Sequence, residues 1–227
     1  MVDEPTRAVV VDIDGTLVDS NYLHVVAWKR AFQAHDVPVV CSRLHEVMGM
    51  GGDRLVEEIA GDEVERDLGD RLRDTWTQRY DELIDELRPL PRAAELLGAI
   101  EERGARVVLA SSGKPQHTRH SLELLGLTED SYPMVTSEEV DTTKPDPEIV
   151  SAALAEVGAR TGLMIGDTVW DVKAAAGVGV PSVAVRTGGI AAAVLRDAGA
   201  RAVYDDVAGV LDHLAEVLDL DTRFGSW

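Results

Sequence analysis

The chain reads Ala8-Val9-Val10-Val11-Asp12-Ile13-Asp14-Gly15-Thr16 near its start, and this stretch decides the fold. Its β-branched run predicts a buried strand over residues 7–11, and the glycine after the acids predicts a turn. Residues two apart in an extended segment point to the same side, so Asp12 and Asp14 can face one small volume. Two carboxylates in one volume repel each other unless a cation balances them. The pair indicates a Mg²⁺ site or phosphoryl transfer, although an acidic turn after a strand also fits it.

Three more polar patches follow apolar runs further along the chain. They are Ser111-Ser112-Gly113, Thr143-Lys144-Pro145 and the segment that holds Asp167 and Asp171. Ligands of open parallel sheets gather beyond the carboxyl ends of the strands, so these side chains can converge on Asp12. Taken alone, Ser111 also fits a turn residue, Lys144 a solvated surface lysine and Asp171 a helix cap.

Short aliphatic runs alternate with amphipathic stretches from residue 104 onward, which is typical of βαβ units. The expected strands cover residues 105–110, 161–165, 182–185 and 202–204. The expected helices cover residues 116–125, 170–176, 190–198 and 207–218. Together with the first strand they predict an α/β fold, in which a parallel, Rossmann-like sheet carries helices on both faces.

Residues 21–87 show helical periodicity and little strand character, which predicts a small all-helical cap inserted into the α/β core. Pro89 and Pro91 end this segment, because proline cannot continue a helix, and a first hinge is expected at residues 16–20. The predicted boundaries are 1–18 and 89–220 for the catalytic core, 19–88 for the cap and 221–227 for a tail.

The composition narrows the classes of partner. The formal charge of −19 disfavours nucleic acids and acidic membranes, because both are bound through basic surfaces. The first residues lack the basic and apolar segments of an export signal, and no segment is long enough to span a bilayer. Cys41 is the only cysteine, which excludes an internal disulfide. We expect a cytoplasmic protein, as a monomer or a homodimer.

In order and spacing, the four patches resemble the motifs of the haloacid dehalogenase-like hydrolase superfamily: a DxDGT strand end, a Ser/Thr strand end, a Lys-Pro segment and a GDxxxD loop. A helical cap between the first two motifs resembles the branch of phosphatases and β-phosphoglucomutases. The resemblance implies a phosphoric monoester hydrolase that uses Mg²⁺ on a small phosphorylated metabolite, such as a sugar phosphate or a phosphoglycolate-like compound. The alternatives are a phosphosugar mutase, a haloacid dehalogenase and a non-catalytic binding relative.

The same resemblance implies roles for four acids. Asp12 would attack phosphorus and carry it as an aspartyl phosphate. Asp14 would act as general acid and base while its backbone carbonyl binds Mg²⁺, and dehalogenases of this superfamily typically lack an acid there. Asp167 would be the second side-chain ligand of Mg²⁺, with Asp171 as an orienting residue, a water-mediated ligand or only a helix cap.

The resemblance also assigns the groups that would hold the phosphate. Ser111 would donate its hydroxyl, and Ser112 and Gly113 their backbone amides. Lys144 would bridge the phosphate and Asp12 and so reduce their mutual repulsion. Cations and fixed donors of this kind stabilise the charge that phosphoryl transfer spreads over the equatorial oxygens.

Residues of the cap bear on the substrate. His24 stands where β-phosphoglucomutases carry a histidine, and it also fits a half-buried helix residue. That mutase places an arginine after a Gly-x-x segment, whereas here Gly51 is followed by Gly52, and Arg54 comes two positions later. The missing arginine disfavours a mutase unless Arg54 replaces it. We expect Gly51 and Gly52 to lie in a flexible loop that closes over the phosphate.

Overall fold

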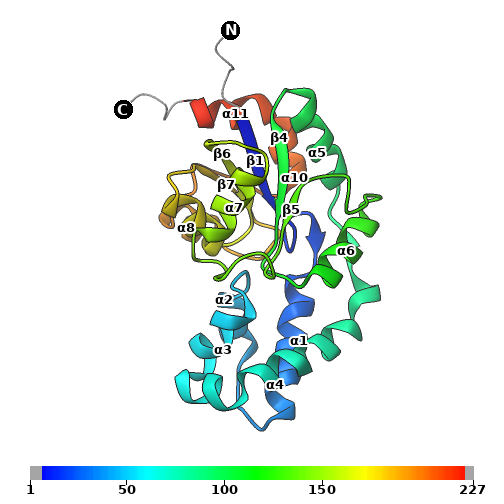
Figure 1. Ribbon diagram of the computed structural model, residues 1–227, viewed down its shortest axis with the longest axis vertical. Coiled ribbons are helices and arrows are strands. Elements are labelled where there is room, and N and C mark those ends of the chain that lie inside the picture. Colours follow the sequence, from blue (N-terminus) through cyan, green and yellow to red (C-terminus); the bar gives the residue numbers. More distant parts are fainter. Residues whose placement is uncertain (1–6, 223–227) are drawn as a thin grey trace.

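The computed structural model describes residues 7–222, in which a parallel sheet with helices on both faces carries a separate group of helices at one end (Figure 1). The strand order is β5-β4-β1-β6-β7-β8, and every neighbouring pair is parallel. The strands are β1 (Arg7–Asp12), β4 (Arg106–Ala110), β5 (Met134–Val135), β6 (Thr161–Gly166), β7 (Ser182–Val185) and β8 (Ala202–Tyr204). The predicted α/β fold is confirmed.

The alternation of side chains along β1 explains why both faces of the sheet are covered. Val9 and Val11 belong to one apolar cluster and Ala8 and Val10 to another, because successive residues of a strand point to opposite faces. The first cluster packs against α5 (Ala93–Glu102), α10 (Val207–Asp212) and α11 (Leu214–Thr222). The second packs against α7 (Glu148–Glu156) and α8 (Val169–Gly177). The remaining core helices are α6 (Pro115–Leu124) and α9 (Ala192–Asp197).

The separate group of helices, called here the helical insertion, leaves the sheet after β1 and returns before α5 (Figure 1). It consists of α1 (Asn21–Ala34), α2 (Cys41–Glu46), α3 (Gly52–Ala60), α4 (Asp62–Asp81) and the 3₁₀ turn η1 (Ile84–Glu86). Phe32 of α1 and Leu72 and Tyr80 of α4 are fully buried and belong to the same apolar cluster as Val9. The insertion is thus joined to the sheet by a continuous core.

The two crossings between the sheet and the insertion lie side by side. β2 (Val18–Asp19) pairs antiparallel with β3 (Arg88–Pro89), and the backbone N–H of Leu90 donates to the carbonyl of Leu17 at 2.8 Å. The paired residues lie in the first expected hinge, residues 16–20, and at or beside Pro89 and Pro91, where the sequence predicts the end of the cap. No helix in residues 7–222 combines the length and the apolar character that crossing a bilayer requires.

The region after β8 differs from the sequence-based expectation of one helix over 207–218. Two helices form there, because the ring of His213 bonds to the carbonyl of Gly209 at 2.9 Å, while the His213 backbone N–H bonds to Val210 instead. The second helix, α11, continues to Thr222 and so enters the expected tail, of which residues 223–227 lie outside the described part. β5 and α7 were not predicted.

A core substitution tests this packing. Ile100 of α5 has no exposed surface, so Ile100→Ala should lower the free energy of unfolding by about 2–5 kcal/mol through lost burial and the cavity it leaves. Val194 of α9 is 49% exposed, and Val194→Ala is the matched control, with an expected change within about 0.5 kcal/mol. Urea unfolding measures both, and equal losses would contradict the assigned core.

Candidate active site

The order of the strands brings distant motifs to the end of β1. β1 pairs with β4 on one side and β6 on the other, and Asp12 lies opposite Ala110. Ser111 follows the end of β4, and Asp167 follows the end of β6. Three polar segments that are far apart in the sequence therefore meet at one edge of the sheet, as they do at the switch points of open α/β sheets.

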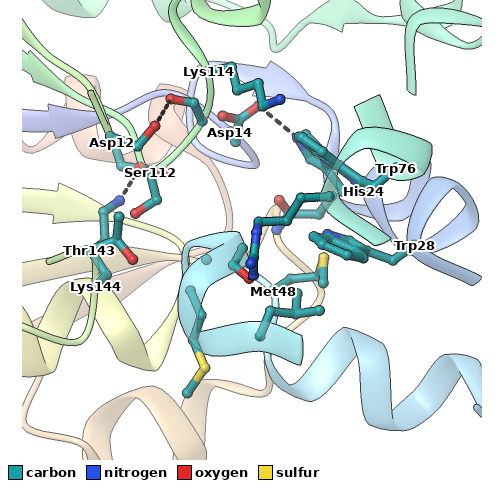
Figure 2. A pocket seen from close by; sticks show the side chains of 18 of the residues that line it. Asp12, Asp14, His24, Trp28, Met48, Trp76, Ser112, Lys114, Thr143 and Lys144 are labelled. Carbon is teal, nitrogen blue, oxygen red and sulfur yellow. Dashed lines mark hydrogen bonds and ion pairs between the residues drawn. The ribbon is translucent and has the colours of Figure 1, made fainter. Parts of the chain in front are cut away.

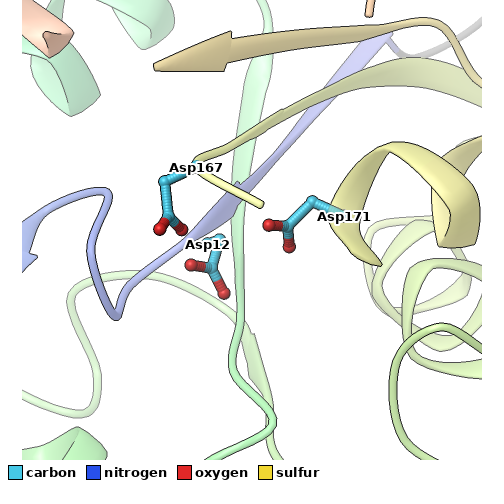
Figure 3. A group of neighbouring side chains, drawn as sticks. All are labelled: Asp12, Asp167 and Asp171. Carbon is cyan, nitrogen blue, oxygen red and sulfur yellow. The ribbon is translucent and has the colours of Figure 1, made fainter. Parts of the chain in front are cut away.

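Asp12, Asp167 and Asp171 form a buried acid cluster (Figure 3). Each contributes a carboxylate oxygen, and these oxygens lie within 4.8 Å of one another. Buried carboxylates this close repel one another strongly, and a cation relieves the repulsion. Oxygen-only donors at this spacing fit a hard divalent cation such as Mg²⁺.

Lys144 places a fixed positive charge beside the acid cluster. Its buried Nζ donates to Oδ1 of Asp12 and, at 2.7 Å, to Oδ1 of Asp171. The other oxygen of Asp171 accepts the backbone N–H of Thr168 at 3.0 Å and its hydroxyl at 2.6 Å, which closes a capping box at the start of α8. Asp171 thus caps a helix and also orients Lys144.

Burial governs the protonation of the cluster. It raises the pKa of Asp12 to about 7, against the lowering effect of Lys144 and with the help of the negative charges of Asp171 and Asp14. Burial likewise raises the pKa of Asp167, reinforced by Asp12 and Asp171. Burial opposes the charge of Lys144, but the attraction of Asp12 and Asp171 outweighs it and raises the lysine pKa. The cluster therefore holds protons tightly unless a cation replaces them.

Asp14 has its own set of partners. Its carboxylate accepts the hydroxyl of Ser20 at 2.8 Å and the hydroxyl of Ser111 at 3.2 Å, and it lies 3.2 Å from Nε2 of His24. Burial acts to raise the pKa of Asp14, but the hydrogen bonds from His24, Ser20 and Ser111 and the charge of His24 together lower it. His24 belongs to α1, so this contact ties the helical insertion to the end of β1.

Two groups of the expected phosphate cradle after β4 already form hydrogen bonds. The hydroxyl of Ser111 is directed to Asp14, and the backbone N–H of Gly113 donates to Ser111 Oγ at 3.0 Å. That amide is therefore already satisfied within the loop. The buried hydroxyl of Ser112 has no hydrogen-bond partner within residues 7–222 and belongs to a side chain that lines the cavity described next.

A cavity of about 280 Å³ lies between Asp12 and the helical insertion (Figure 2). From the core it is lined by charged and polar side chains, among them Asp12, Asp14, Ser112, Lys114, Thr143 and Lys144. From the insertion it is lined by Asn21, His24, Trp28, Met48, Gly49, Met50, Gly52, Leu55, Arg73 and Trp76. The structure thus places His24 and Gly52 at the cavity.

Two of the expected substrate contacts in the insertion lie elsewhere. Gly51 immediately precedes α3 and Arg54 is exposed, and neither is among the cavity-lining residues of the described chain. Helical geometry accounts for Arg54: Gly52 and Leu55 are three residues apart and share the face toward the cavity, and Arg54, two positions after Gly52, is not on that face. Arg73 of α4 is the arginine that reaches the cavity.

Glycines allow the backbone to approach this site closely, and Gly15 and Gly49 do so with a positive φ. Gly15 has φ +77°, and a Cβ there would lie 2.4 Å from Oδ2 of Asp167. Gly49 has φ +94°, and a Cβ there would lie 2.7 Å from Oγ1 of Thr168. The positive φ favours glycine at both positions. The missing side chains let the turn after β1 pack against Asp167 and the insertion pack against Thr168, the next residue.

Sequence reasoning missed two residues that support the cluster. Thr16 is buried, with Oγ1 at 3.3 Å from Oδ2 of Asp12 and 3.2 Å from Oδ1 of Asp167. Asn21 donates Nδ2 to Oδ2 of Asp167 at 2.6 Å. Thr16 belongs to the DxDGT stretch, so its position was a signal, whereas nothing in the sequence marks the first residue of α1 as a partner of Asp167.

Residues 6–179 match a family model described as haloacid dehalogenase-like hydrolase. The chain is 32% identical to a phosphoglycolate phosphatase from Rhodospirillum rubrum, over 92% of this chain and 90% of that protein. It is 30% identical to an N-acetylmuramic acid 6-phosphate phosphatase from Pseudomonas aeruginosa, over 80% of this chain and 82% of that protein.

Solved structures share the whole architecture. A hydrolase from Pseudomonas syringae superposes with a TM-score of 0.89 at 33% identity, over 93% of this chain and 99% of that chain. CbbY from Rhodobacter sphaeroides, solved in complex with phosphate, superposes with a TM-score of 0.71 at 19% identity, over 90% of this chain and 96% of that chain. The second likeness shows the fold alone.

The raised pKa of Asp12 gives a testable dependence of stability on pH in the presence of a chelator. Between the ordinary pKa of 3.8 and about 7, the folded protein holds a proton on Asp12 that the unfolded chain has released. The free energy of unfolding should therefore fall as the pH rises from about 5 to 7, by up to about 1.4 kcal/mol per pH unit from this group. Asp12→Asn should reduce the decline. Exposed Asp19 provides the control Asp19→Asn, and a decline unchanged in Asp12→Asn would refute the shift.

Proposed function

Because the chain belongs to the haloacid dehalogenase-like hydrolase family, we propose that it is a Mg²⁺-dependent phosphatase that hydrolyses a small phosphorylated metabolite. The observation that carries the proposal is the acid cluster with Lys144, which opens on a cavity lined by Ser112 and Lys114. Phosphoryl transfer needs anionic groups that bind a metal ion, and cationic and hydroxyl groups that bind the phosphate.

Asp12 and Asp14 divide the chemistry. A carboxylate oxygen of Asp12 attacks phosphorus, so that a new O–P bond forms while the O–P bond to the alcohol breaks. Asp14 gives a proton to the departing alcohol oxygen, because a bound phosphate dianion nearby raises the proton affinity of that carboxyl. Asp14 then takes a proton from water, and the water oxygen attacks phosphorus, which releases inorganic phosphate and regenerates Asp12.

The surrounding residues stabilise charge and hold the geometry. Asp12, Asp167 and the backbone carbonyl of Asp14 would hold Mg²⁺, with Asp171 beside them, and the bound ion would neutralise charge on the phosphate oxygens. Lys144 keeps Asp12 close to the phosphate by balancing its charge. Ser111 orients Asp14, and the unpaired hydroxyl of Ser112 is available to a phosphate oxygen.

The helical insertion acts as the lid of this site in our proposal. Its junction with the core lies at the pair Val18 and Pro89, which supports boundaries of 1–18 and 89–220 for the core and 19–88 for the lid. His24, hydrogen-bonded to Asp14, closes the site from the lid side. Enclosure of this kind excludes water other than the attacking molecule and limits the substrate to a small one.

Two substitutions test the assigned roles. Asp12→Asn removes the attacking charge and should lower Mg²⁺-dependent hydrolysis of an aryl phosphate by about 10³-fold or more. Asp14→Asn removes the proton donor and should cost about 10²–10⁴-fold while Mg²⁺ binding persists. Phosphate release and Mg²⁺ titration by calorimetry measure the two effects, and a chelator should stop turnover until Mg²⁺ is restored. Asp19→Asn, an exposed neighbour, is the control, and unchanged turnover in either site variant would disprove these roles.

A product assay separates the phosphatase from a mutase. A mutase must hold a second phosphate near the lid, and exposed Arg54 does not line the cavity. With Mg²⁺ and a set of sugar phosphates, we expect free phosphate to equal the substrate consumed, without isomerised sugar phosphate. Isomer formed without phosphate release would overturn hydrolysis in favour of the mutase. The Asp12→Asn variant should form neither free phosphate nor isomerised sugar phosphate. This control shows that the measured activity comes from this site.

A further inference from the structure

The cavity has two chemically different halves. The acid cluster, Lys144 and Lys114 belong to the core half, where the phosphate would lie. Five apolar side chains of the helical insertion form the facing side, called here the apolar wall: Trp28, Met48, Met50, Leu55 and Trp76. In Figure 2, Trp28 and Met48 lie well apart from Asp12 and Lys144. The wall therefore faces the part of a substrate that leaves with the alcohol.

Stacked aromatic rings make the apolar wall rigid. The rings of Trp28 and Trp76 lie 5.3 Å apart at 19°, and Trp76 stacks in turn on Tyr80 at 5.5 Å. Trp28 is 4% and Trp76 8% exposed, so both are fixed by packing. A preformed surface of this kind favours a ligand with an apolar face, because binding removes apolar area from water without reordering the protein.

Each basic side chain by which the described part of the insertion lines the cavity already has an anionic partner. Arg73 reaches the cavity, but its Nη1 donates to the carbonyl of Gly52 at 3.1 Å and to Glu65 at 3.0 Å. Its Nη2 bonds to Asp70 at 2.8 Å and lies 2.9 Å from Glu65. Two carboxylates thus face one guanidinium, whose terminal donors are occupied. His24, the other basic residue of the insertion at the cavity, is bonded to Asp14.

We propose that the substrate is a phosphate monoester of an uncharged alcohol with an apolar face, which lies against Trp28 and Trp76. A neutral sugar and an aryl alcohol share this chemistry. A carboxylate or a second phosphate on the alcohol would meet the apolar wall and the two acids around Arg73, and it would lose hydration without gaining a counter-charge from the insertion. The proposal rests on the phosphatase function above, and it separates this chain from its relative named for phosphoglycolate.

A panel of substrates tests the proposal with the full chain and saturating Mg²⁺. We compare kcat/KM for a neutral hexose 6-phosphate, phenyl phosphate, phosphoglycolate and a hexose bisphosphate. The kcat/KM of the better neutral ester should exceed that of each charged ester by about ten-fold or more. Burial of part of an apolar face provides a ratio of this size. The ratio of the two neutral esters tells a sugar from an aryl substrate. A charged ester that equals or exceeds the neutral ones overturns this inference and leaves the phosphatase intact, whereas no Mg²⁺-dependent release from any ester removes both.

Substitutions in the wall connect the preference to its residues. Trp76→Ala should lower kcat/KM for the better neutral ester by about ten-fold, mainly through KM, while Trp76→Phe, which keeps an aromatic ring, stays within about three-fold. Inhibition by inorganic phosphate should change little, because it needs only the core half. Trp170→Ala, which removes an indole outside the cavity lining, is the matched control. Equal effects of Trp76→Ala and Trp170→Ala would contradict the role of the wall.

A second variant keeps the test decisive if Trp76→Ala does not fold. Met50 belongs to the apolar wall and is half-buried. Met50→Gln replaces an apolar side chain by a polar one with little change in volume. We expect kcat/KM for the better neutral ester to fall by about three-fold or more, with phosphoglycolate turnover unchanged. A uniform change for neutral and charged esters would count against selection by the wall. Thermal melting of each variant shows whether the fold is kept.

Discussion

Electrostatic repulsion among three buried carboxylates is the constraint on which the rest of the site depends. Asp12, Asp167 and Asp171 come within 4.8 Å of one another, and Lys144 balances only part of their charge. In a buried site such repulsion is relieved by protons or by a divalent cation, so metal binding and protonation of Asp12 compete. A bound cation favours the anionic form of Asp12, and Mg²⁺ would therefore activate the nucleophile that we propose.

The fold concentrates this charge through strand order rather than through local sequence. β1 lies at the centre of the sheet, with β4 and β6 as its neighbours, so the loops after all three strands open on one edge. Gly15 and Gly49 let the backbone come close enough to close that edge from both sides. A single apolar cluster joins the sheet to the helical insertion, and this common core fixes the position of the insertion relative to the sheet.

The sequence was enough to predict the site residues that follow the ends of strands. It was not enough to predict the residues whose positions depend on how the helices of the insertion pack. The places of Asp12, Ser111 and Asp167 follow from apolar runs that end in polar residues, because parallel strands share one carboxyl edge. Arg54 and Arg73 show the opposite case. Both are arginines on helices of the insertion, and which of them reaches the cavity depends on where α3 begins and how α4 packs. Helical periodicity predicts a buried face, but it does not tell which element that face meets.

The cavity has a charged core half and an apolar wall. In our proposal the core half carries out catalysis, and the apolar wall selects the substrate. Asp12, Ser112 and Lys144 of the core half would recognise the phosphate, which all phosphate monoesters share. Discrimination then falls to Trp28 and Trp76, which stabilise an apolar face and leave an anion unsolvated. Desolvation of a wrong group costs more than a lost apolar contact, so a wall of this kind selects mainly by exclusion. Altering the wall would therefore change which alcohol is accepted while the phosphoryl chemistry of Asp12 and Asp14 stays the same.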